Sequence, residues 1–330
     1  MELTEIRQEI DAIDTQLAEL FARRLDAVRR VAEAKAESGR TIRDHARERS
    51  ILNRVTAIVG DDHAPYVRDL YKQIFSLSRA READVIDDDS ALCELIRSSC
   101  EKYAGKKLPS RALVACQGAE GAYAQQACER LFTYPDILYF DHFDGVFSAV
   151  EKGMCEYGVL PIENTTAGSV TQVYDLMESH RFHIARACKL RVDHRLMRKQ
   201  GASGPIREVV SHEQALRQCS YFLDAHPEYT ATAMANTAVA AQYVVDTCRD
   251  DLAVIASRDC ADLYGLTVES ETINNTASNY TRFICISRHP EIYSNAGKIS
   301  IMCSLPHEVG SLNAMLTRLA LAGINLCKLE

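Results

Sequence analysis

The sequence predicts a chain of three parts: an all-helical segment, a longer α/β segment and a short α+β segment. Between residues 3 and 31, apolar residues recur at steps of three and four, as on one face of an amphipathic helix. From residue 112, short apolar runs alternate with helical patterns, which is typical of strands joined by helices. A strand–helix–strand pattern follows residue 297.

Composition excludes several classes of protein. The 330 residues are 47% hydrophobic and 25% charged, as in soluble globular proteins of two or three domains. A net charge of −8 argues against a general nucleic-acid binder. No apolar run approaches the roughly 18 residues of a membrane span, and the N-terminus lacks a signal-peptide core. Twelve cysteines without a CxxC pair indicate reduced thiols in a cytoplasmic protein.

The first domain, residues 1–83, is expected to contain three helices, at 4–37, 43–59 and 65–82. A helix of 34 residues is about 51 Å long, too long for a compact three-helix monomer. Its apolar stripe needs cover along its whole length. We therefore expect a dimer of interlocked helices, or a higher homo-oligomer.

A connector at 84–110 is expected to hold one helix, over 91–103. Across 111–291, the predicted strands are 112–116, 157–162, 208–211, 252–257 and 282–287, each of the first four followed by a helix. Such alternation indicates a largely parallel sheet with helices on its faces. Helix N-termini that converge on one crevice would form a carboxylate site.

Two cations interrupt the apolar stripe of the first helix. Arg24 and Lys35 lie on the stripe and differ by only about 20° around the helix axis. Their side chains could extend from the helix edge into water. However, further polar residues lie on or next to the apolar stripes: Arg7 beside the first, Arg47 and Glu48 just before the second, and Ser78 and Glu82 on the third. A bundle lined in this way needs a charged ligand, and we expect a small dianion.

These residues resemble the all-helical chorismate mutase family, in the segments IRQEIDAID, FARRLD, AK and RDxxRERxxL over residues 2–82. The resemblance implies that Arg24, Lys35, Asp44, Arg47, Glu48 and Ser78 are active-site residues. It also implies that Arg7 is donated across the dimer. At position 82 the common bacterial glutamine is replaced by Glu82.

The resemblance implies the rearrangement of chorismate to prephenate. This reaction suits such residues, because a pericyclic shift needs no nucleophile or metal. Arginine forks bind carboxylates, and Lys35 is our choice to stabilise charge on the breaking ether oxygen. Glu48 and Asp44 would hold the substrate hydroxyl or orient the cations. Glu82 can donate to the ether oxygen only when it is protonated. Mutase activity should then fall with rising pH, and Glu82→Gln should flatten the fall.

The segment 112–290 resembles prephenate dehydratase, in the motifs GAEGAY, PIENTTAGSV, VVSHEQALRQCSYF and NNTASNYTRF. The resemblance implies two α/β lobes around a cleft, like periplasmic binding proteins. It implies a signature triplet at Thr281, Arg282 and Phe283. It also implies further site residues at Asn164, Ser211 and Gln218, and we add Thr165.

The roles of these residues follow from the dehydratase reaction. Prephenate must lose its ring hydroxyl and carbon dioxide, and the hydroxyl needs a proton or a strong hydrogen bond to leave. Thr281 would supply the hydrogen bond, with Glu163 as one candidate for the proton source. Each residue also has an ordinary interpretation. Asn164 and Thr165 could form a helix cap, Arg282 could face outward from a strand, and Phe283 could be a core residue. His194 is expected to be structural, and His180 and His183 are not expected to bind a metal.

Residues 296–330 resemble the first half of an ACT regulatory domain, a βαββαβ module that binds amino acids. Gly310, Ser311 and Leu312 match its Gly-Ala-Leu position. The module needs roughly 70 residues, so we expect the natural protein to continue. The resemblance implies feedback inhibition by L-phenylalanine in the full-length protein.

The sequence therefore predicts a bifunctional enzyme that converts chorismate to prephenate and then to phenylpyruvate, without a cofactor. The lack of a GxGxxG turn weighs against a prephenate dehydrogenase partner domain. The remaining alternative is a ligand sensor with a helical dimerisation domain. That alternative leaves Arg24, Lys35 and Arg47 without a ligand.

Overall fold

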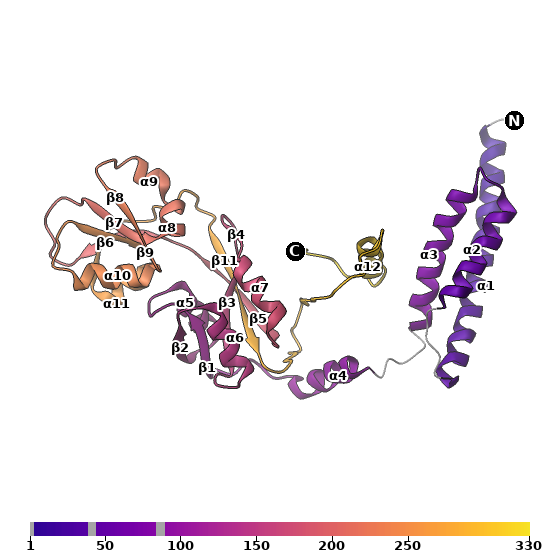
Figure 1. Cartoon of the computed structure of the whole chain (residues 1–330), viewed down its shortest axis with the longest axis horizontal. Helices are drawn as coiled ribbons and strands as arrows, with labels where there is room; N and C mark the ends of the chain where they lie inside the picture. The colour runs from indigo at the N-terminus through magenta and orange to yellow at the C-terminus, as the bar shows by residue number, and fades with distance from the viewer. Residues whose placement is uncertain (1–2, 39–43, 84–89) are drawn as a thin grey trace. The chain divides into compact units, whose positions relative to one another are not determined.

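The computed structural model describes residues 3–38, 44–83 and 90–330, and it begins with three helices (Figure 1). They are α1 (Leu3–Ser38), α2 (His45–Val59) and α3 (Ala64–Ala83). The carboxylate of Asp44 caps α2 by accepting a hydrogen bond from the Arg47 amide at 2.9 Å. Gly60 ends α2 with a φ of +72°, a conformation that favours glycine. Local sequence signals therefore set the bounds of α2.

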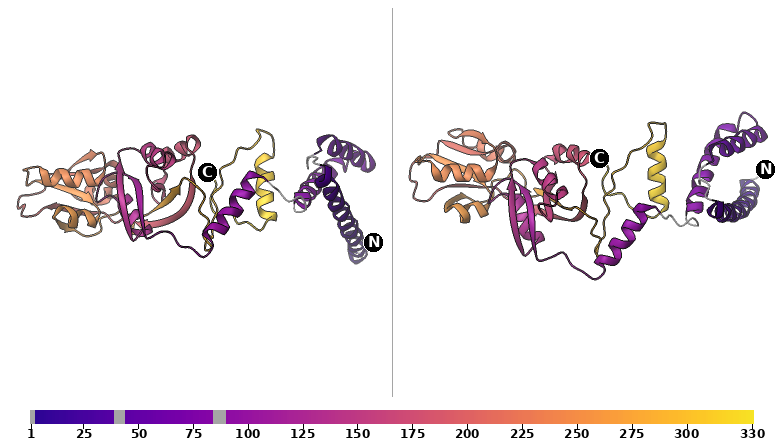
Figure 2. Two further views of the ribbon diagram at one scale, coloured as in Figure 1. Left: turned by 90° about the horizontal axis from the view of Figure 1, so that it is seen from below. Right: turned by 60° about the horizontal axis from the view of Figure 1, so that its bottom comes forward.

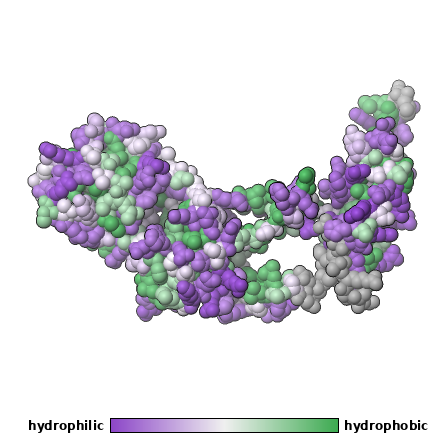
Figure 3. All heavy atoms as spheres, in the orientation of Figure 1, coloured by the Kyte–Doolittle hydropathy of each residue, from purple (hydrophilic) through white to green (hydrophobic). Residues whose placement is uncertain are grey.

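The helical domain has little core of its own. Helix α3 packs against both α1 and α2. Among the residues described there, the buried apolar side chains are Ala32, Val55 and Phe75. The apolar stripe of α1 stays exposed, including Leu17 at 54%, and apolar side chains reach the surface of this domain (Figure 3). A stripe of this length is stable in water only when another surface covers it.

Residues 94–300 form one compact unit with two lobes, which lie next to one another in both views of Figure 2. The first lobe is a six-stranded sheet in the order β2-β1-β3-β11-β5, with β4 paired to β3. Its strands are β1 (Arg111–Gln117), β2 (Tyr134–Phe140), β3 (Tyr157–Asn164), β4 (Gly168–Ser169), β5 (His183–Arg191) and β11 (Tyr280–Ser287). One face packs on α5 (Tyr123–Leu131), and the other packs on α6 (Phe143–Glu151) and α7 (Thr171–Ser179).

The second lobe is a five-stranded sheet in the order β10-β6-β9-β7-β8. Its strands are β6 (Arg195–Lys199), β7 (Glu208–His212), β8 (Thr230–Met234), β9 (Leu252–Ala256) and β10 (Leu266–Ser270). Helices α10 (Thr237–Asp246) and α11 (Arg258–Tyr264) pack on one face. Helices α8 (Glu213–Gln218) and α9 (Ser220–Asp224) pack on the other. Every residue of β9 is buried, as expected for a central strand.

Both sheets are mixed, so the prediction of a largely parallel sheet is wrong. The pairs β1–β2, β1–β3, β7–β8 and β7–β9 are parallel, whereas β3–β11, β5–β11, β6–β9 and β6–β10 are antiparallel. The physical reason is that the chain crosses between the lobes twice. It leaves the first lobe after β5 and returns with β11, which runs against its neighbours.

Two further helices lie outside the sheets. Helix α4 (Ala91–Tyr103) is tied to the first lobe's C-terminal extension, because the Ser99 hydroxyl donates to the Pro290 carbonyl at 2.9 Å. Helix α12 (Ser311–Leu321) is the only regular element described in residues 296–330. The strands expected around α12 are not formed, because a strand needs a hydrogen-bonded neighbour and neither segment has one there.

Two general properties of the chain concern membrane-spanning helices and disulfide bonds. No helix among the described residues is long and apolar enough to cross a lipid bilayer. All twelve cysteines are free thiols, and they include buried residues of both lobes, such as Cys116 and Cys260.

Candidate active sites

The cations of the α1 stripe meet polar side chains of α3. The Arg24 guanidinium donates to the Ser78 hydroxyl and lies 5.9 Å from the centre of the Phe75 ring. The Lys35 ammonium is 2.8 Å from a carboxylate oxygen of Glu82. Ser78 and Glu82 are only 5% and 8% exposed. Arg24 and Lys35 are therefore held against α3, which differs from the interpretation in which they extend into water.

Burial also affects the electrostatics of this cluster. It lowers the pKa of Arg24 below its usual value, while the nearby Tyr71 and Glu82 act in the opposite direction. An arginine side chain still carries its charge at neutral pH after such a change. A half-buried cation in this position is poised to attract an anion, since its attraction is less screened than at the open surface.

The first turn of α2 contributes a second part of the predicted site. The Glu48 carboxylate forms an ion pair with Arg79 of α3. Arg47 is exposed on α2, and Asp44 is engaged as the cap of the helix. Arg79 was missed by the sequence analysis, because it follows Ser78 directly and so lies off the stripe. The motif gave no signal that Arg79 would pair with Glu48, 31 residues away.

Arg7 lies far from the other cations within one chain. It is exposed near the start of α1, seventeen residues before Arg24. At about 1.5 Å per residue, the two positions are about 26 Å apart along the helix axis. A small ligand held by Arg24 is therefore beyond the reach of Arg7 of the same chain.

In the α/β unit, three side-chain amides form a closed ring of hydrogen bonds. The Asn164 nitrogen donates to the Asn279 oxygen at 2.8 Å, and the Asn279 nitrogen donates to the Gln218 oxygen at 2.9 Å. The Gln218 nitrogen completes the ring towards the Asn164 oxygen at 3.3 Å. It also donates to the Thr166 hydroxyl at 2.9 Å. We call these three residues the amide ring; it joins β3 and the residue before β11 to α8 of the second lobe.

Backbone groups fix the direction of the amide ring. The Asn164 oxygen accepts from the amides of Thr166 and Ala167, at 3.0 and 2.9 Å, and a backbone amide can only donate. The nitrogen of Asn164 must therefore face the other way. It donates to the Thr281 hydroxyl oxygen at 2.9 Å. Because that oxygen accepts this bond, the hydroxyl proton of Thr281 is left to point at another acceptor.

A cavity of about 490 Å³ lies between α8, the β3–β4 turn and the connector to β11. Its lining shares Gln218 and Asn279 with the amide ring. The full set of lining residues is Thr166, Ala167, Gln214, Arg217, Gln218, Tyr221, Asn274, Asn275, Thr276 and Asn279. Thr281 is next to this lining: Asn164 donates both to the Thr281 hydroxyl and to Asn279, which lines the cavity. Amides, hydroxyls and one arginine are the donors that a carboxylate ligand needs.

The remaining predicted residues lie elsewhere. The Thr165 hydroxyl accepts from the Tyr280 amide and donates to the Ser278 carbonyl, so it ties the β3–β4 turn to β11. Ser211 is buried, and its hydroxyl donates to the Ile255 carbonyl. Arg282 lies 3.7 Å from Glu163 on the neighbouring strand. These positions give the three residues structural partners outside the cavity lining.

Phe283 requires a correction. It is 3% exposed and packs with Val114, Val159 and other residues of the core beneath α5. The register of β11 shifts between Arg282 and Phe283, and the side chains beyond this point are buried on both faces. Phe283 is therefore a core residue rather than part of the cavity wall.

Comparison with known proteins identifies both segments. Residues 114–291 match the family model of prephenate dehydratase, and residues 6–83 match that of chorismate mutase type II. The chain belongs to the prephenate dehydratase family. Its first domain is a chorismate mutase type II domain.

Two curated relatives match different shares of the chain. Arogenate dehydratase/prephenate dehydratase 2 of Arabidopsis thaliana is 36% identical over 76% of this chain and 67% of its own length. The bifunctional chorismate mutase/prephenate dehydratase of Escherichia coli K12 is 28% identical over 99% of this chain and 84% of its own. This second alignment runs through both domains and into the C-terminal segment.

Solved structures share the fold of the dehydratase domain. The prephenate dehydratase of Arthrobacter aurescens, solved with L-Phe, has a TM-score of 0.59 at 22% identity, over 66% of this chain and 75% of that one. GqqA, described as a novel type of quorum quenching acylase, has a TM-score of 0.56 at 26% identity, over 66% and 80%.

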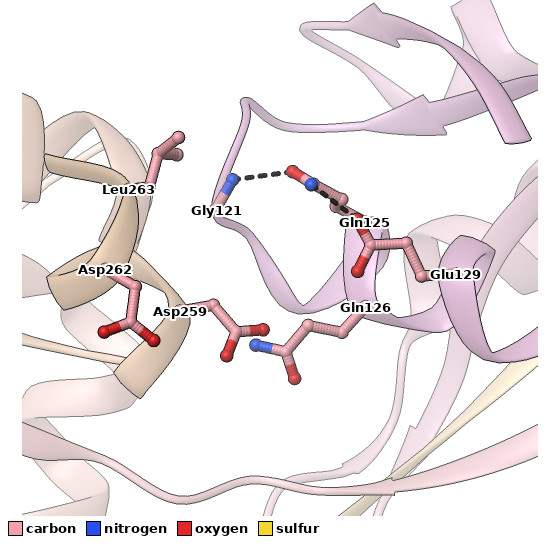
Figure 4. Close-up of a pocket in the computed structure, with 7 residues that line it drawn as sticks. All are labelled: Gly121, Gln125, Gln126, Glu129, Asp259, Asp262 and Leu263. Carbon is pink, nitrogen blue, oxygen red and sulfur yellow. Dashed lines mark hydrogen bonds between the residues drawn. The ribbon is translucent and has the colours of Figure 1, made fainter. Parts of the chain in front are cut away.

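A second, smaller cavity of about 210 Å³ lies between the dehydratase lobes (Figure 4). Gly121 has a φ of +89°, and a Cβ there would lie only 3.1 Å from the Cys260 sulfur, so the turn at GAEGAY requires a glycine. Three carboxylates line this cavity: Glu129, Asp259 and Asp262. Burial and the other two carboxylates raise the pKa of Asp259 above its usual value. Such a cavity repels a dianion.

The dehydratase domain also shows what the sequence analysis missed. Asn279, Thr166 and Arg217 lie in motifs that we had quoted, but nothing in their spacing singled them out. The same holds for Asn274 and Asn275, which open the quoted motif NNTASNYTRF, whereas His194 was expected to be structural. The β-ladder that pairs Thr281 with Asn164 explains why such distant residues meet.

The residues assigned to a regulatory site lie at the start of α12. Gly310 precedes the helix with a φ of +89°, Ser311 is its first residue and Leu312 is exposed. Apolar residues on both sides of α12, such as Ile301 and Leu326, are exposed as well. The ACT interpretation of residues 296–330 therefore stays a prediction.

Proposed function

We propose that the chain converts chorismate to prephenate in its helical domain and prephenate to phenylpyruvate in its α/β domain, as part of phenylalanine biosynthesis. The observation that carries this proposal is the presence of both catalytic domains on one chain, in reaction order. Prephenate, the product of the first site, is the substrate of the second.

The mutase site works by holding its substrate and balancing charge. Chorismate carries two carboxylates, and its rearrangement moves negative charge onto the breaking ether oxygen. Arg24 and Arg47 would bind the carboxylates, with Glu48 and Asp44 around them. Lys35 would donate to the ether oxygen. The position of Lys35 against Glu82 supports this role, because the ion pair holds its ammonium beside a buried carboxylate of α3.

The site needs a second copy of the chain. Arg7 reaches the ligand only from a partner whose α1 lies against this helical domain, given its distance from Arg24 along the helix. The exposed apolar stripe of α1 supports such a pairing, since a symmetric dimer would bury it on both copies. We therefore propose a homodimer that encloses the substrate.

The dehydratase site acts on the ring hydroxyl of prephenate. The prephenate dianion takes up one proton and yields the phenylpyruvate anion, carbon dioxide and water. The carbon–oxygen bond breaks as the electrons of the carboxylate bond enter the ring. Thr281 would donate to the departing hydroxyl, since Asn164 occupies its oxygen as a donor. Arg217 and the amides of the cavity would hold the carboxylates.

Two further properties complete the proposal. Residues 296–330 would form part of an ACT domain through which L-phenylalanine inhibits the enzyme. A related prephenate dehydratase has been solved with L-Phe bound. The enzyme would act in the cytoplasm, the compartment in which free thiols such as those of its twelve cysteines persist.

A time course with chorismate tests the proposal. The wild-type chain should consume chorismate and release phenylpyruvate, with prephenate as a transient. Thr281→Val keeps the size of the side chain but removes the hydroxyl, so prephenate should accumulate and the dehydratase rate should fall by at least about 100-fold.

Thr281→Ser is the matched control, because it keeps the hydroxyl and should keep most of the activity. Chorismate consumption should be the same in all three proteins. Tight binding of an amino acid without turnover of either substrate would contradict the proposal and support a ligand sensor.

A further inference from the structure

His194 lies behind the amide ring, in the short connector between β5 and β6. It is 3% exposed. Its Nε2 is 3.0 Å from the Gln218 oxygen, and its backbone amide donates to the Asn274 side chain at 2.7 Å. The connector thus holds the ring of His194 directly against α8 of the second lobe.

The direction of the amide ring determines the tautomer of His194. The backbone amides of Thr166 and Ala167 fix Asn164, Asn164 fixes Asn279, and Asn279 donates to the Gln218 oxygen. This oxygen only accepts, so His194 must carry its proton on Nε2. Its Nδ1 is then an acceptor, 3.4 Å from the Tyr123 hydroxyl, which donates to the Asp193 carbonyl at 2.9 Å.

The imidazole is also neutral under ordinary conditions. Burial lowers the pKa of His194 to about 4. The titratable and charged groups that face it are Tyr123 of α5, Asp193 of its own connector and His212 at the start of α8. Burial raises the pKa of Tyr123 well above its usual value, so this neighbour is neutral too.

We propose that His194 is a positioning residue of the dehydratase: its Nε2–H holds the Gln218 amide in the orientation that keeps the Thr281 hydroxyl free to donate to the substrate. This inference rests on the proposed dehydratase function and deepens it. His194 itself does not touch the cavity, since Gln218 stands between them. Its effect on the reaction passes through Gln218 and Asn164.

The hydrogen-bond geometry shows why the Nε2–H donor of His194 matters for the orientation of Gln218. Without it, the Gln218 oxygen keeps the Asn279 donor alone, and the Gln218 amide is held less firmly. A turned amide would present its oxygen to the Thr166 hydroxyl and the Asn164 oxygen. The Asn164 oxygen cannot become a donor, so the ring would open on that side. Asn164 would then lose support in the position from which it donates to Thr281. A misplacement on the order of 1 Å at a reacting group costs about 100-fold in rate.

The test compares two variants of His194 in the whole chain. His194→Phe keeps a flat ring but has no donor, and we expect kcat on prephenate to fall by about 10- to 100-fold with little change in KM. His194→Gln places an amide nitrogen where Nε2 was, and it should restore most of kcat. His226→Phe, at a histidine that stacks on Tyr229 away from the cavity, is the matched control and should keep the wild-type kcat.

The outcomes separate this inference from the proposed function. Wild-type protein without dehydratase activity would contradict the proposed function. Active wild type with an unchanged His194→Phe variant, or a His194→Gln variant as slow as His194→Phe, would overturn the role of His194. Mutase activity of the same samples reports whether the protein is intact.

A second measurement does not depend on the folding of any variant. Long-range ¹H–¹⁵N spectra of the wild-type histidine side chains report the tautomer of each ring. His194, assigned by its contacts with Tyr123, should be the neutral Nε2–H form between pH 6 and 8, values about 2 or more units above its pKa. An Nδ1–H tautomer or an imidazolium would overturn the proposal.

Discussion

Individual residues of the proposed mutase site follow from helical periodicity, whereas their partners in the structure do not. The spacing along α1 placed Arg24 and Lys35 on its apolar stripe, and Ser78 and Glu82 on the stripe of α3, and the structure brings these four residues together. The pairing of Glu48 with Arg79 depends on how α2 packs on α3, which no local pattern encodes. Packing of this kind is a tertiary property, and so the sequence could not predict it.

The pair of Lys35 and Glu82 leads to a prediction at the same scale. The Glu82 carboxylate accepts from the Lys35 ammonium, and a carboxylate has no hydrogen of its own, so Glu82 can donate to the ether oxygen of the substrate only in its protonated form. Mutase activity should therefore decline as pH rises, and Glu82→Gln should remove this decline, because its amide always carries a donor. The measurement is kcat/KM for chorismate across the pH range of stable protein.

The dehydratase activity of the same samples is the control, and its pH profile should not change in Glu82→Gln. A mutase profile that is identical in the variant and the wild type would show that Glu82 does not act as the proton-bearing donor.

Among the elements, helices were easier to predict than strands. Sequence periodicity placed α1, α2, α3 and α4 within two residues of their observed ends. Five strands with strong apolar runs were also placed. The strands β2, β4, β5, β6, β8 and β10 were missed, because they are very short, as in β4, or interrupted by polar residues, as in HIARACKLR of β5. The antiparallel return of β11 depends on the crossing between lobes, which lies beyond the reach of any local signal.

The α1 helix provides a prediction about an element. Leu17 lies on its exposed apolar stripe, and each leucine buried in an interface contributes about 2 kcal/mol. Leu17→Asp changes both copies in a symmetric dimer, so the dissociation constant should rise by at least about 100-fold. Sedimentation should show monomers, with mutase activity lost and dehydratase activity kept.

Gln8→Asp is the matched control for this variant. Position 8 is nine residues from Leu17, about half a turn away around the helix axis, and so faces away from the stripe. It should leave the dimer and both activities unchanged. A Leu17→Asp protein that stays dimeric with full mutase activity would show that the stripe is not the interface.

At the scale of the whole molecule, the two sites differ in how they are assembled. The amide ring, the cavity and Thr281 all come from residues 164–281 of one chain. The helical domain, in contrast, separates Arg7 from Arg24 by about 26 Å and leaves its apolar stripe uncovered. The central claim is that one site lies within a single chain and the other lies between two copies.

The most direct test is a mixed dimer of an Arg7→Ala chain and a Lys35→Ala chain, purified through a different tag on each. If Arg7 acts across the dimer, one of the two mutase sites carries both changes and the other carries neither. The mixed dimer should then recover about half of the wild-type mutase activity, although each parent is inactive, and dehydratase activity should be full in all of them. A mixed dimer as inactive as its parents would contradict the claim.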